Sequence, residues 1–249
     1  MPSILKLDRL SKNFAGLAAL KDVSFDVEEG GIVGLIGPNG AGKTTLLSII
    51  AGSLRPTSGS ILFQGREISG AKSYHAVRAG IARTHQIPKP FRRLSVLENV
   101  EVGLRFGSAS SASTSTKRSA HRTSNAMEFL DRVGLASLSH MPASTLSVGD
   151  MKRLELARTL AARPSLLLCD EVCSGLTATE AASILELLCD IRRAGTSVLY
   201  VEHNLRAIMS VCDRVIVMNS GQKLAEGTPE SVQNNPSVIE AYIGRKAEA

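Results

Sequence analysis

The chain has 249 residues, 43% of them hydrophobic, which is enough to build a sizeable core in one large or two small domains. Its net charge is +6, but aromatic residues make up only 4% and tryptophan is absent, so a stacking surface for single-stranded nucleic acid is poorly supplied. The four cysteines form no C-x-x-C pair and no stretch approaches about 18 uncharged apolar residues, so we expect no disulfide framework, zinc site, export signal or membrane span.

The first third of the chain predicts strands followed by a helix. Apolar runs and alternation indicate strands at residues 4–10, 23–27 and 32–36. A glycine-rich loop comes next, and a helix is expected from Lys43 to about Ala51. Shorter strands are expected at residues 60–64 and 81–85.

The middle of the chain is helical in pattern. From about residue 88, apolar residues recur at spacings of three and four, which predicts helices at residues 96–106 and 126–133. Between them, residues 107–124 form a Ser/Thr/Ala tract that is too polar to build a core. We interpret this tract as a mobile surface insertion.

Strands and helices alternate again toward the C-terminus. Strands are expected at residues 166–169, 196–201 and 214–218, and a helix is expected at residues 178–193. This alternation favours an α/β fold with a largely parallel sheet, interrupted by a helical piece.

The segment GPNGAGKT, residues 37–44, fits the phosphate-loop pattern G-x-x-x-x-G-K-[ST] between an apolar strand and a helix. Its glycines let backbone N–H groups turn inward, and the helix N-terminus adds partial positive charge. Lys43 would reach the β and γ phosphates, and the hydroxyl of Thr44 would hold magnesium. A glycine turn before an ordinary helix is the alternative, but the context favours a nucleotide site of unspecified reaction.

Two adjacent carboxylates, Asp170 and Glu171, end the apolar strand at residues 166–169. A lone pair of this kind is ordinarily solvated or caps a turn. A phosphate-loop site needs an acidic residue at the end of a neighbouring strand to orient magnesium, and Asp170 is placed for that. Because consecutive side chains of a strand point to opposite faces, Glu171 is free to polarise the attacking water as a general base.

Further motifs in the expected order resemble those of the nucleotide-binding subunit of ABC transporters. LSVGD (146–150) and the basic, apolar helix after it are similar to the signature sequence, and SGLT (174–177) is similar to the D-loop. HQIPKPF places Gln86 at the Q-loop, VEHN places His203 at the switch histidine, and KNFAG places Phe14 at the adenine-stacking position.

The resemblance implies a P-loop, ABC-type nucleotide-binding domain with a RecA-like core, an N-terminal antiparallel β subdomain and an inserted α-helical subdomain. Its core would span residues 1–87 and 161–249, and its helical part residues 88–160. The implied catalytic residues are Lys43, Gln86, Glu171 and His203. Magnesium would be held by Thr44, Gln86 and Asp170. The implied ATP-binding residues are Phe14, Gly37, Pro38, Asn39, Gly40, Ala41, Gly42, Lys43, Thr44, Thr45, Ser147 and Gly149.

Within the family, residues 83–103 and 217–244 look most like the ATP-binding proteins of branched-chain amino acid importers, although importers of urea or short amides share this look. The resemblance implies an ATP-hydrolysing importer subunit on the cytoplasmic face of the plasma membrane. Its partners would be membrane permease subunits, a second ATP-binding subunit that is identical or related, and indirectly an extracytoplasmic solute-binding protein, with no nucleic acid.

Two rival functions are weighed against this one. A soluble ABC-type ATPase acting on nucleic acid or ribosomes would bind them through its net charge of +6. However, such proteins usually carry a long coiled coil or a second ATPase module, and the sequence shows neither. A non-enzymatic nucleotide sensor is supported only by Val172, where proline usually follows the acidic pair, and by Thr177, where Asp or Asn is usual.

Two further positions depart from the family pattern, Val148 at the first signature glycine and Asp150 at the glutamine. We expect hydrolysis to survive because the groups that would touch phosphate, metal or water are present. The segment Ser147-Val-Gly-Asp150 also fits a capping box, which is a purely structural role. In the family this helix end points at the γ phosphate of the opposite subunit.

His203 and Phe14 also have ordinary explanations. A lone histidine is more often a surface or satisfied core residue, but His203 directly follows a buried strand, where imidazole can position water. Considered alone, Phe14 would be assigned an ordinary packing role in the core or in a turn. Its role in stacking on adenine rests on the resemblance.

Overall fold

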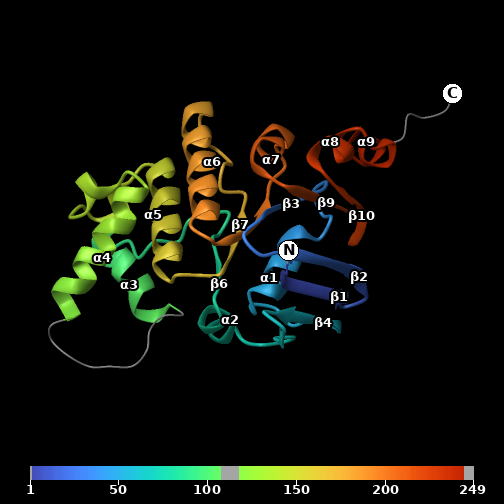
Figure 1. The fold of residues 1–249 in the computed structure, drawn as a ribbon, viewed down its shortest axis with the longest axis horizontal. Coiled ribbons are helices and arrows are strands. Elements are labelled where there is room, and N and C mark those ends of the chain that lie inside the picture. Colours follow the sequence, from blue (N-terminus) through green and yellow to red (C-terminus); the bar gives the residue numbers. More distant parts are fainter. Residues whose placement is uncertain (1, 108–117, 244–249) are drawn as a thin grey trace.

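The computed structural model describes residues 2–107 and 118–243, and the side chains of residues 118–124 and Ile243 are not described. Two sheets form the body of this part of the chain (Figure 1). A four-stranded antiparallel sheet has the order β2-β1-β4-β5. A six-stranded sheet has the order β10-β9-β3-β8-β7-β6, with parallel pairing throughout except between β10 and β9.

The strands are β1 (Ser3–Phe14), β2 (Leu17–Glu28), β3 (Ile32–Ile36), β4 (Ser58–Phe63), β5 (Arg66–Glu67), β6 (Ile81–Arg83), β7 (Leu166–Asp170), β8 (Ser197–Val201), β9 (Arg214–Asn219) and β10 (Gln222–Gly227). The α-helices are α1 (Lys43–Ile50), α2 (Ser73–Ala79), α3 (Val96–Phe106), α4 (Arg118–Arg132), α5 (Val148–Ala161), α6 (Ala178–Arg193), α7 (Leu205–Val211), α8 (Pro229–Gln233) and α9 (Pro236–Ile243).

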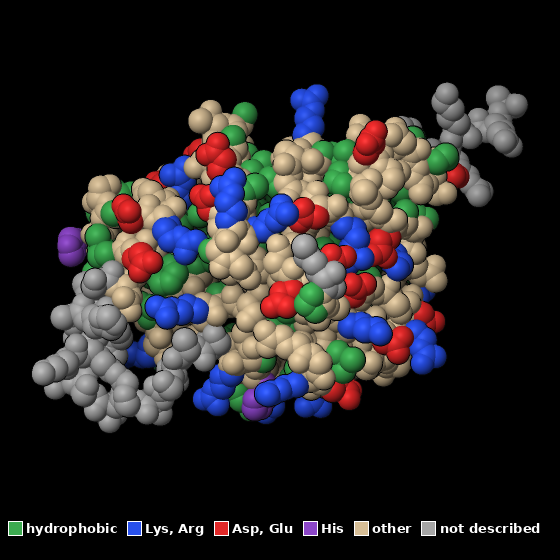
Figure 2. Space-filling view, in the orientation of Figure 1, with side chains coloured by type: hydrophobic (Ala, Val, Ile, Leu, Met, Phe, Trp, Pro, Cys, Tyr) green, Lys and Arg blue, Asp and Glu red, His purple; other side chains and the backbone are tan. Residues whose placement is uncertain are grey.

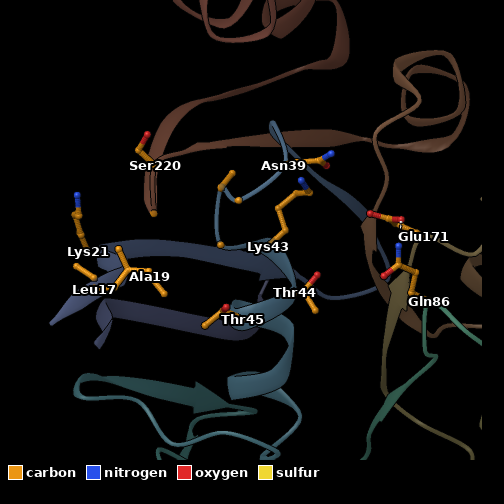
Figure 3. A pocket seen from close by; sticks show the side chains of 15 residues that line it. Leu17, Ala19, Lys21, Asn39, Lys43, Thr44, Thr45, Gln86, Glu171 and Ser220 are labelled. Atoms are coloured by element: carbon orange, nitrogen blue, oxygen red, sulfur yellow. Dashed lines mark hydrogen bonds between the residues drawn. The ribbon is translucent and has the colours of Figure 1, made fainter. Parts of the chain in front are cut away.

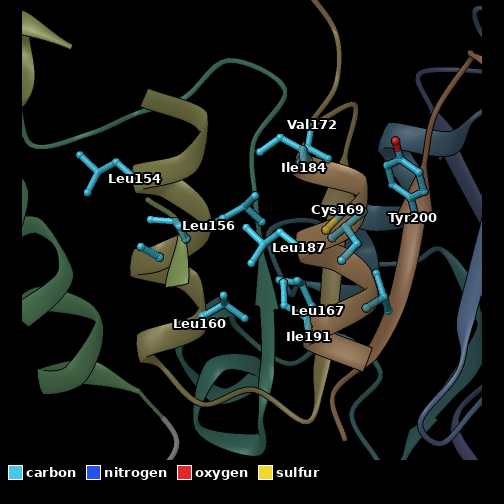
Figure 4. Packing of buried hydrophobic residues seen from close by; sticks show 14 of the residues in the cluster. Leu154, Leu156, Leu160, Leu167, Cys169, Val172, Ile184, Leu187, Ile191 and Tyr200 are labelled. Atoms are coloured by element: carbon cyan, nitrogen blue, oxygen red, sulfur yellow. The ribbon is translucent and has the colours of Figure 1, made fainter. Parts of the chain in front are cut away.

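The central strands β3, β7 and β8 of the six-stranded sheet are buried on both faces. Alternate residues of β7 and β8 belong to different hydrophobic clusters, because side chains alternate across a strand. Leu167 and Cys169 pack on the helical side with α5 and α6, as Figure 4 shows, whereas Leu166 and Leu168 pack on the side of α1. Burial on both faces explains why these strands are continuous apolar runs.

The helices α3, α4 and α5 form a group beside the sheet, to the left in Figure 1. Helix α3 begins at a capping box in which Ser95 accepts the N–H of Glu98 and the Glu98 carboxylate accepts the N–H of Ser95. Gly103 is needed at the crossing with α5, because a Cβ there would lie 2.2 Å from the carbonyl oxygen of Arg158. The capping box fixes where this helical piece starts, and the glycine lets its helices approach closely.

Most expected elements are confirmed, and three residue ranges, β3, α3 and α6, match in full. One interpretation needs correction: α4 begins at Arg118, so the last part of the Ser/Thr/Ala tract, which we interpreted as a mobile surface insertion, belongs to a helix. Residues 108–117 of that tract lie outside the described residues. The elements β5, α2, α7, β10, α8 and α9 were not expected individually.

Candidate active site

The phosphate-loop segment joins β3 to α1 and turns through two strained glycine positions. Gly37 has φ +151° and Gly42 has φ +97°. A Cβ on Gly37 would lie 2.1 Å from the carbonyl oxygen of Met218, and one on Gly42 would lie 2.7 Å from that of Ala19. These positions therefore require glycine, and the loop packs closely against β9 and β2.

Lys43, the first residue of α1, is held at the mouth of this loop. Its side chain is 7% exposed, and Nζ donates hydrogen bonds to the carbonyl oxygens of Gly37 at 2.6 Å and Pro38 at 3.0 Å. Burial lowers the pKa of Lys43, while Glu171 and Asp170 act in the opposite direction. The ammonium group is thus partly desolvated, and its hydrogen-bond partners are uncharged backbone carbonyl groups.

Four parallel strands end at the same edge of the sheet, and each delivers polar residues there. The phosphate loop follows β3, and Gln86 follows β6. Asp170 and Glu171 come at the end of β7, and His203 comes just after β8. This convergence at the carboxyl ends of strands is typical of ligand sites in α/β sheets.

The two adjacent carboxylates make different contacts, because Asp170 ends β7 whereas Glu171 lies in the turn after it. Asp170 is buried and its Oδ2 accepts a hydrogen bond from Nη2 of Arg83 at 2.8 Å. Glu171 has φ +49°, which turns the chain at the end of β7 and carries its carboxylate toward the cavity. There Oε2 accepts from Nε2 of Gln86 at 2.6 Å (Figure 3).

The cavity has a volume of about 540 Å³ and is bounded by the phosphate loop, β2 and the Gln86–Glu171 pair (Figure 3). It brings together nine of the expected residues, namely Asn39, Gly40, Ala41, Gly42, Lys43, Thr44, Thr45, Gln86 and Glu171. Sequence reasoning missed six lining residues, namely Leu17, Ala18, Ala19, Lys21, Ser220 and Gly221. The first four of these residues lie in β2 and the last two lie in the turn between β9 and β10. Neither segment contains a recognisable sequence motif.

Seven expected residues do not line this cavity. They are Phe14, Gly37, Pro38, Ser147, Gly149, Asp170 and His203. Phe14 lies exposed next to it, paired with the lining residue Leu17, and Lys12 Nζ stands 4.9 Å from its ring centroid. His203 is 55% exposed, with Nδ1 3.9 Å from Oε1 of Glu171.

The oxygen atoms near the loop fit a magnesium ion. Asp170 Oδ1 is buried and has no hydrogen-bond partner among the described residues, and the hydroxyl-bearing Thr44 is exposed to the cavity. No group of three or more His, Cys, Asp or Glu that could hold a metal occurs in the described part of the chain. Magnesium is commonly bound by only one or two protein oxygen ligands, with substrate phosphates supplying others, so this small number of oxygen donors is suitable.

The signature segment begins α5, and its cap differs from the expected capping box. Ser147 Oγ accepts the N–H of Asp150 at 3.1 Å, but the Asp150 carboxylate accepts the Ser147 hydroxyl at 2.7 Å rather than a backbone N–H. The cap is therefore only half of a capping box. Asp150 stiffens the turn that carries Ser147, and Val148 beside it is exposed.

The two departures near the acidic pair have structural roles. Val172 is buried and belongs to the hydrophobic cluster under α5 and α6, so it packs where the family usually has proline (Figure 4). Thr177 accepts the N–H of Glu180 and forms a full capping box at the start of α6. Both residues therefore shape the loop between β7 and α6.

Helix α5 is also tied to the segment that carries Gln86. Glu155 is 4% exposed, and its Oε1 accepts the backbone N–H of His85 at 3.1 Å. Burial raises the pKa of Glu155 to about 7, against the opposing effects of Arg158, the His85 N–H, Lys152 and Lys89. The link between the signature helix and the Gln86 segment therefore contains a carboxyl group that titrates near neutral pH.

A pH-dependent stability follows from Glu155. Its pKa is higher in the folded chain than the ordinary 4.5, so the folded state binds the proton more tightly and loses stability as the pH rises from about 4.5 to about 7. Between pH 5 and 8 the wild type should lose about 2 to 3 kcal/mol more unfolding free energy than Glu155→Gln. Urea unfolding across this range measures the difference, and parallel curves for the two proteins would contradict it.

These features define a P-loop nucleotide-binding ATPase. Residues 20–174 match the family model described as ABC transporter, and residues 222–248 match one described as Branched-chain amino acid ATP-binding cassette transporter. The chain belongs to the ABC transporter family and is one of its ATPases. The expected α/β fold class is confirmed.

Individual relatives agree with the family match. LivG of Escherichia coli (strain K12), a high-affinity branched-chain amino acid transport ATP-binding protein, is 37% identical and covers 97% of this chain and 98% of that protein. The ADP conformation of MJ1267, an ATP-binding cassette of an ABC transporter, has a TM-score of 0.86 and 30% identity, covering 98% and 100%. A dimeric post-hydrolysis structure of the cassette MJ0796, bound to ADP and Pi, has a TM-score of 0.81 and 26% identity, covering 90% and 98%.

Proposed function

We propose that this ATPase drives the uptake of branched-chain amino acids, or of related small amides, through a membrane transporter. The match of residues 222–248 to the branched-chain cassette model carries the substrate class, because it covers β10, α8 and α9, outside the ATPase motifs. The near full-length similarity to LivG supports the same assignment.

For hydrolysis we assign separate tasks to the groups around the cavity. Lys43 contacts the β and γ phosphates, and Glu171 accepts a proton from the attacking water, 2.6 Å from the Gln86 amide that orients it. Thr44, Gln86 and Asp170 would hold magnesium, which would neutralise the negative charge that develops on the phosphate oxygens. His203, 3.9 Å from Glu171, positions the water or the γ phosphate.

We further propose that two ATP-binding subunits close head to tail on two ATP molecules. Ser147 and Gly149 do not line the cavity of their own chain, so a partner's α5 would complete each site. The helix N-terminus and the Ser147 hydroxyl suit an anion there. The exposed Phe14 would stack on the adenine of its own site.

The helical piece, proposed as a subdomain of residues 88–160 in a single ATPase domain, would receive the membrane permease subunits. Exposed apolar side chains occur around it at Ile87, Phe91 and Met141, which is the composition expected of a docking surface. No helix among the described residues is long and apolar enough to cross a membrane. On the similarity to transport ATP-binding proteins, we propose a peripheral location on the cytoplasmic face, with an extracytoplasmic binding protein delivering the solute.

The rival role on nucleic acid lacks a comparable observation. On the face shown in Figure 2, basic and acidic side chains are interspersed rather than gathered into one basic stripe. Nucleic-acid binding relies on such a concentration of positive charge.

The transport proposal predicts ATP-dependent uptake when this chain is produced together with its membrane subunits and binding protein. Vesicles should accumulate labelled leucine, isoleucine or valine, and Glu171→Gln should abolish the accumulation because hydrolysis supplies the energy. Urea and short amides serve as competing substrates. Uptake of none of these solutes, or retention of transport by Glu171→Gln, would contradict the proposal.

A further inference from the structure

Helix α5 carries a buried lysine that the nucleotide site does not use. Lys152 is 5% exposed, and its Nζ donates hydrogen bonds to the carbonyl oxygens of Glu171 at 3.2 Å and Ser174 at 2.5 Å. Both acceptors lie in the loop between β7 and α6. A lysine buried this deeply is uncommon unless it is paired, so its contacts need an explanation.

We propose that Lys152 is a positioning residue for the carboxylate of Glu171, an inference that rests on the proposed role of Glu171 in hydrolysis. The lysine does not reach the cavity. It acts on the backbone that sets the direction of the carboxylate. Its hydrogen bonds hold the carbonyl groups of Glu171 itself and of Ser174, three residues further along the loop.

The loop needs such support because Glu171 is in the left-handed region, with φ +49°, which is costly for a residue with a side chain. Its N–H donates to the carbonyl oxygen of Val201 at 2.9 Å, which anchors the N-terminal side of the residue to β8. Its carbonyl oxygen, on the other side, accepts from Lys152 Nζ at 3.2 Å and from the N–H of Ser174 at 3.2 Å. With both sides held, the side chain points at Gln86, where the 2.6 Å hydrogen bond is made.

A buried carboxylate of opposite charge holds the same loop from the sheet. Glu202 is 1% exposed, and its Oε1 accepts the N–H of Cys173 at 3.0 Å while Oε2 accepts the N–H of His203 at 3.2 Å. Burial lowers the pKa of Lys152, and Cys173, Glu202 and Glu171 act against that effect. The ammonium and the carboxylate therefore flank the loop, one from α5 and one from the residue that follows β8.

The position of Lys152 along α5 gives this contact a consequence for the two-site dimer. Ser147 and Gly149, assigned to the ATP of the partner, lie at the start of the same helix, less than two turns from Lys152. A helix moves largely as a unit, so a displacement of its N-terminus by the partner's ATP is transmitted to the Glu171 backbone. One helix thus links the phosphate of one site to the base of the other.

The test measures steady-state ATP hydrolysis and ATP binding of Lys152→Met, with Lys152→Arg as the conservative variant. We expect kcat of Lys152→Met to fall roughly 10- to 100-fold with the KM for ATP changed less than about twofold, because a misaimed group slows the chemical step rather than binding. Arginine should restore most of kcat. Lys6→Met, which removes an exposed lysine from β1, is the matched control and should match the wild type.

A second pair of variants covers the case in which Lys152→Met fails to fold because Glu202 is left buried without the nearby cation. Lys152→Met in a Glu202→Gln background removes both charges, and it should still turn over at least about 10-fold more slowly than Glu202→Gln alone. Equal kcat in these two proteins, or a folded Lys152→Met with wild-type kcat, would overturn the inference.

Glu171→Gln separates this inference from the function on which it rests. Wild-type turnover by Glu171→Gln would defeat the assignment of Glu171 itself. Low turnover by Glu171→Gln together with wild-type turnover by Lys152→Met would defeat only the positioning role.

Discussion

Glu171→Gln is expected to lower the rate of ATP hydrolysis at least about 100-fold while ATP binding is retained. The carboxylate is the proposed general base, and an amide of the same shape cannot take a proton. The substitution should preserve the fold, because the new side-chain oxygen can still accept the hydrogen bond that Gln86 now donates at 2.6 Å. ATP should therefore be bound and held without turnover.

Phosphate release measures kcat, and equilibrium binding of ATP measures the affinity of the same preparations. Glu67→Gln, which changes an exposed carboxylate on β5, is the matched control and should hydrolyse ATP at the wild-type rate. A folded Glu171→Gln protein that also hydrolyses at that rate would show that another group activates the water. Near-zero turnover by both Glu171→Gln and the wild type would favour a nucleotide sensor.

The strand β3 and the helix α6 were predictable from the sequence because local pattern and packing agree there. The strand Ile32–Ile36 is a pure apolar run, and both of its faces are buried. The helix Ala178–Arg193 combines a capping box at Thr177 with apolar residues at helical spacing. In both segments the residue choice and the burial that results point to the same structure.

Short elements were harder to predict because their periodicity cannot be read. Helices α7 (Leu205–Val211) and α8 (Pro229–Gln233) have 7 and 5 residues, which is about two turns or fewer. Their existence depends on side-chain caps from Asn204 and Thr228 and on packing against the sheet. Such tertiary contacts are not encoded in a local pattern.

The candidate site also contains residues that were predictable from the sequence and residues that were not. The phosphate loop and the acidic pair were predictable because their chemistry is carried by residues adjacent in sequence. Lys152 and Glu202 were not, since a charged residue in a helix or at a strand end is ordinarily solvated. Only the folded chain shows that both are buried and that they approach the loop of Glu171 from separate elements.

Lys43→Met is expected to weaken ATP binding at least about 100-fold. Two hydrogen bonds from an ammonium to charged phosphates are together worth about 3 kcal/mol or more, and methionine provides none. The stability of the nucleotide-free protein should not decrease. Burial lowers the pKa of Lys43, which means that its charged form is less stable in the folded chain than in water. Removing that desolvated charge should leave the free energy of unfolding unchanged or raise it.

Binding titrations with ATP and urea unfolding of the nucleotide-free protein measure the two effects separately. Lys6→Met on β1 should change neither quantity, because Lys6 is exposed and lies outside the cavity. Wild-type affinity in a folded Lys43→Met protein would mean that backbone N–H groups of the loop carry the phosphate alone. A large loss of stability without nucleotide would instead mean that the bonds to Gly37 and Pro38 hold the loop together, and that Lys43 acts on the fold before it acts on ATP.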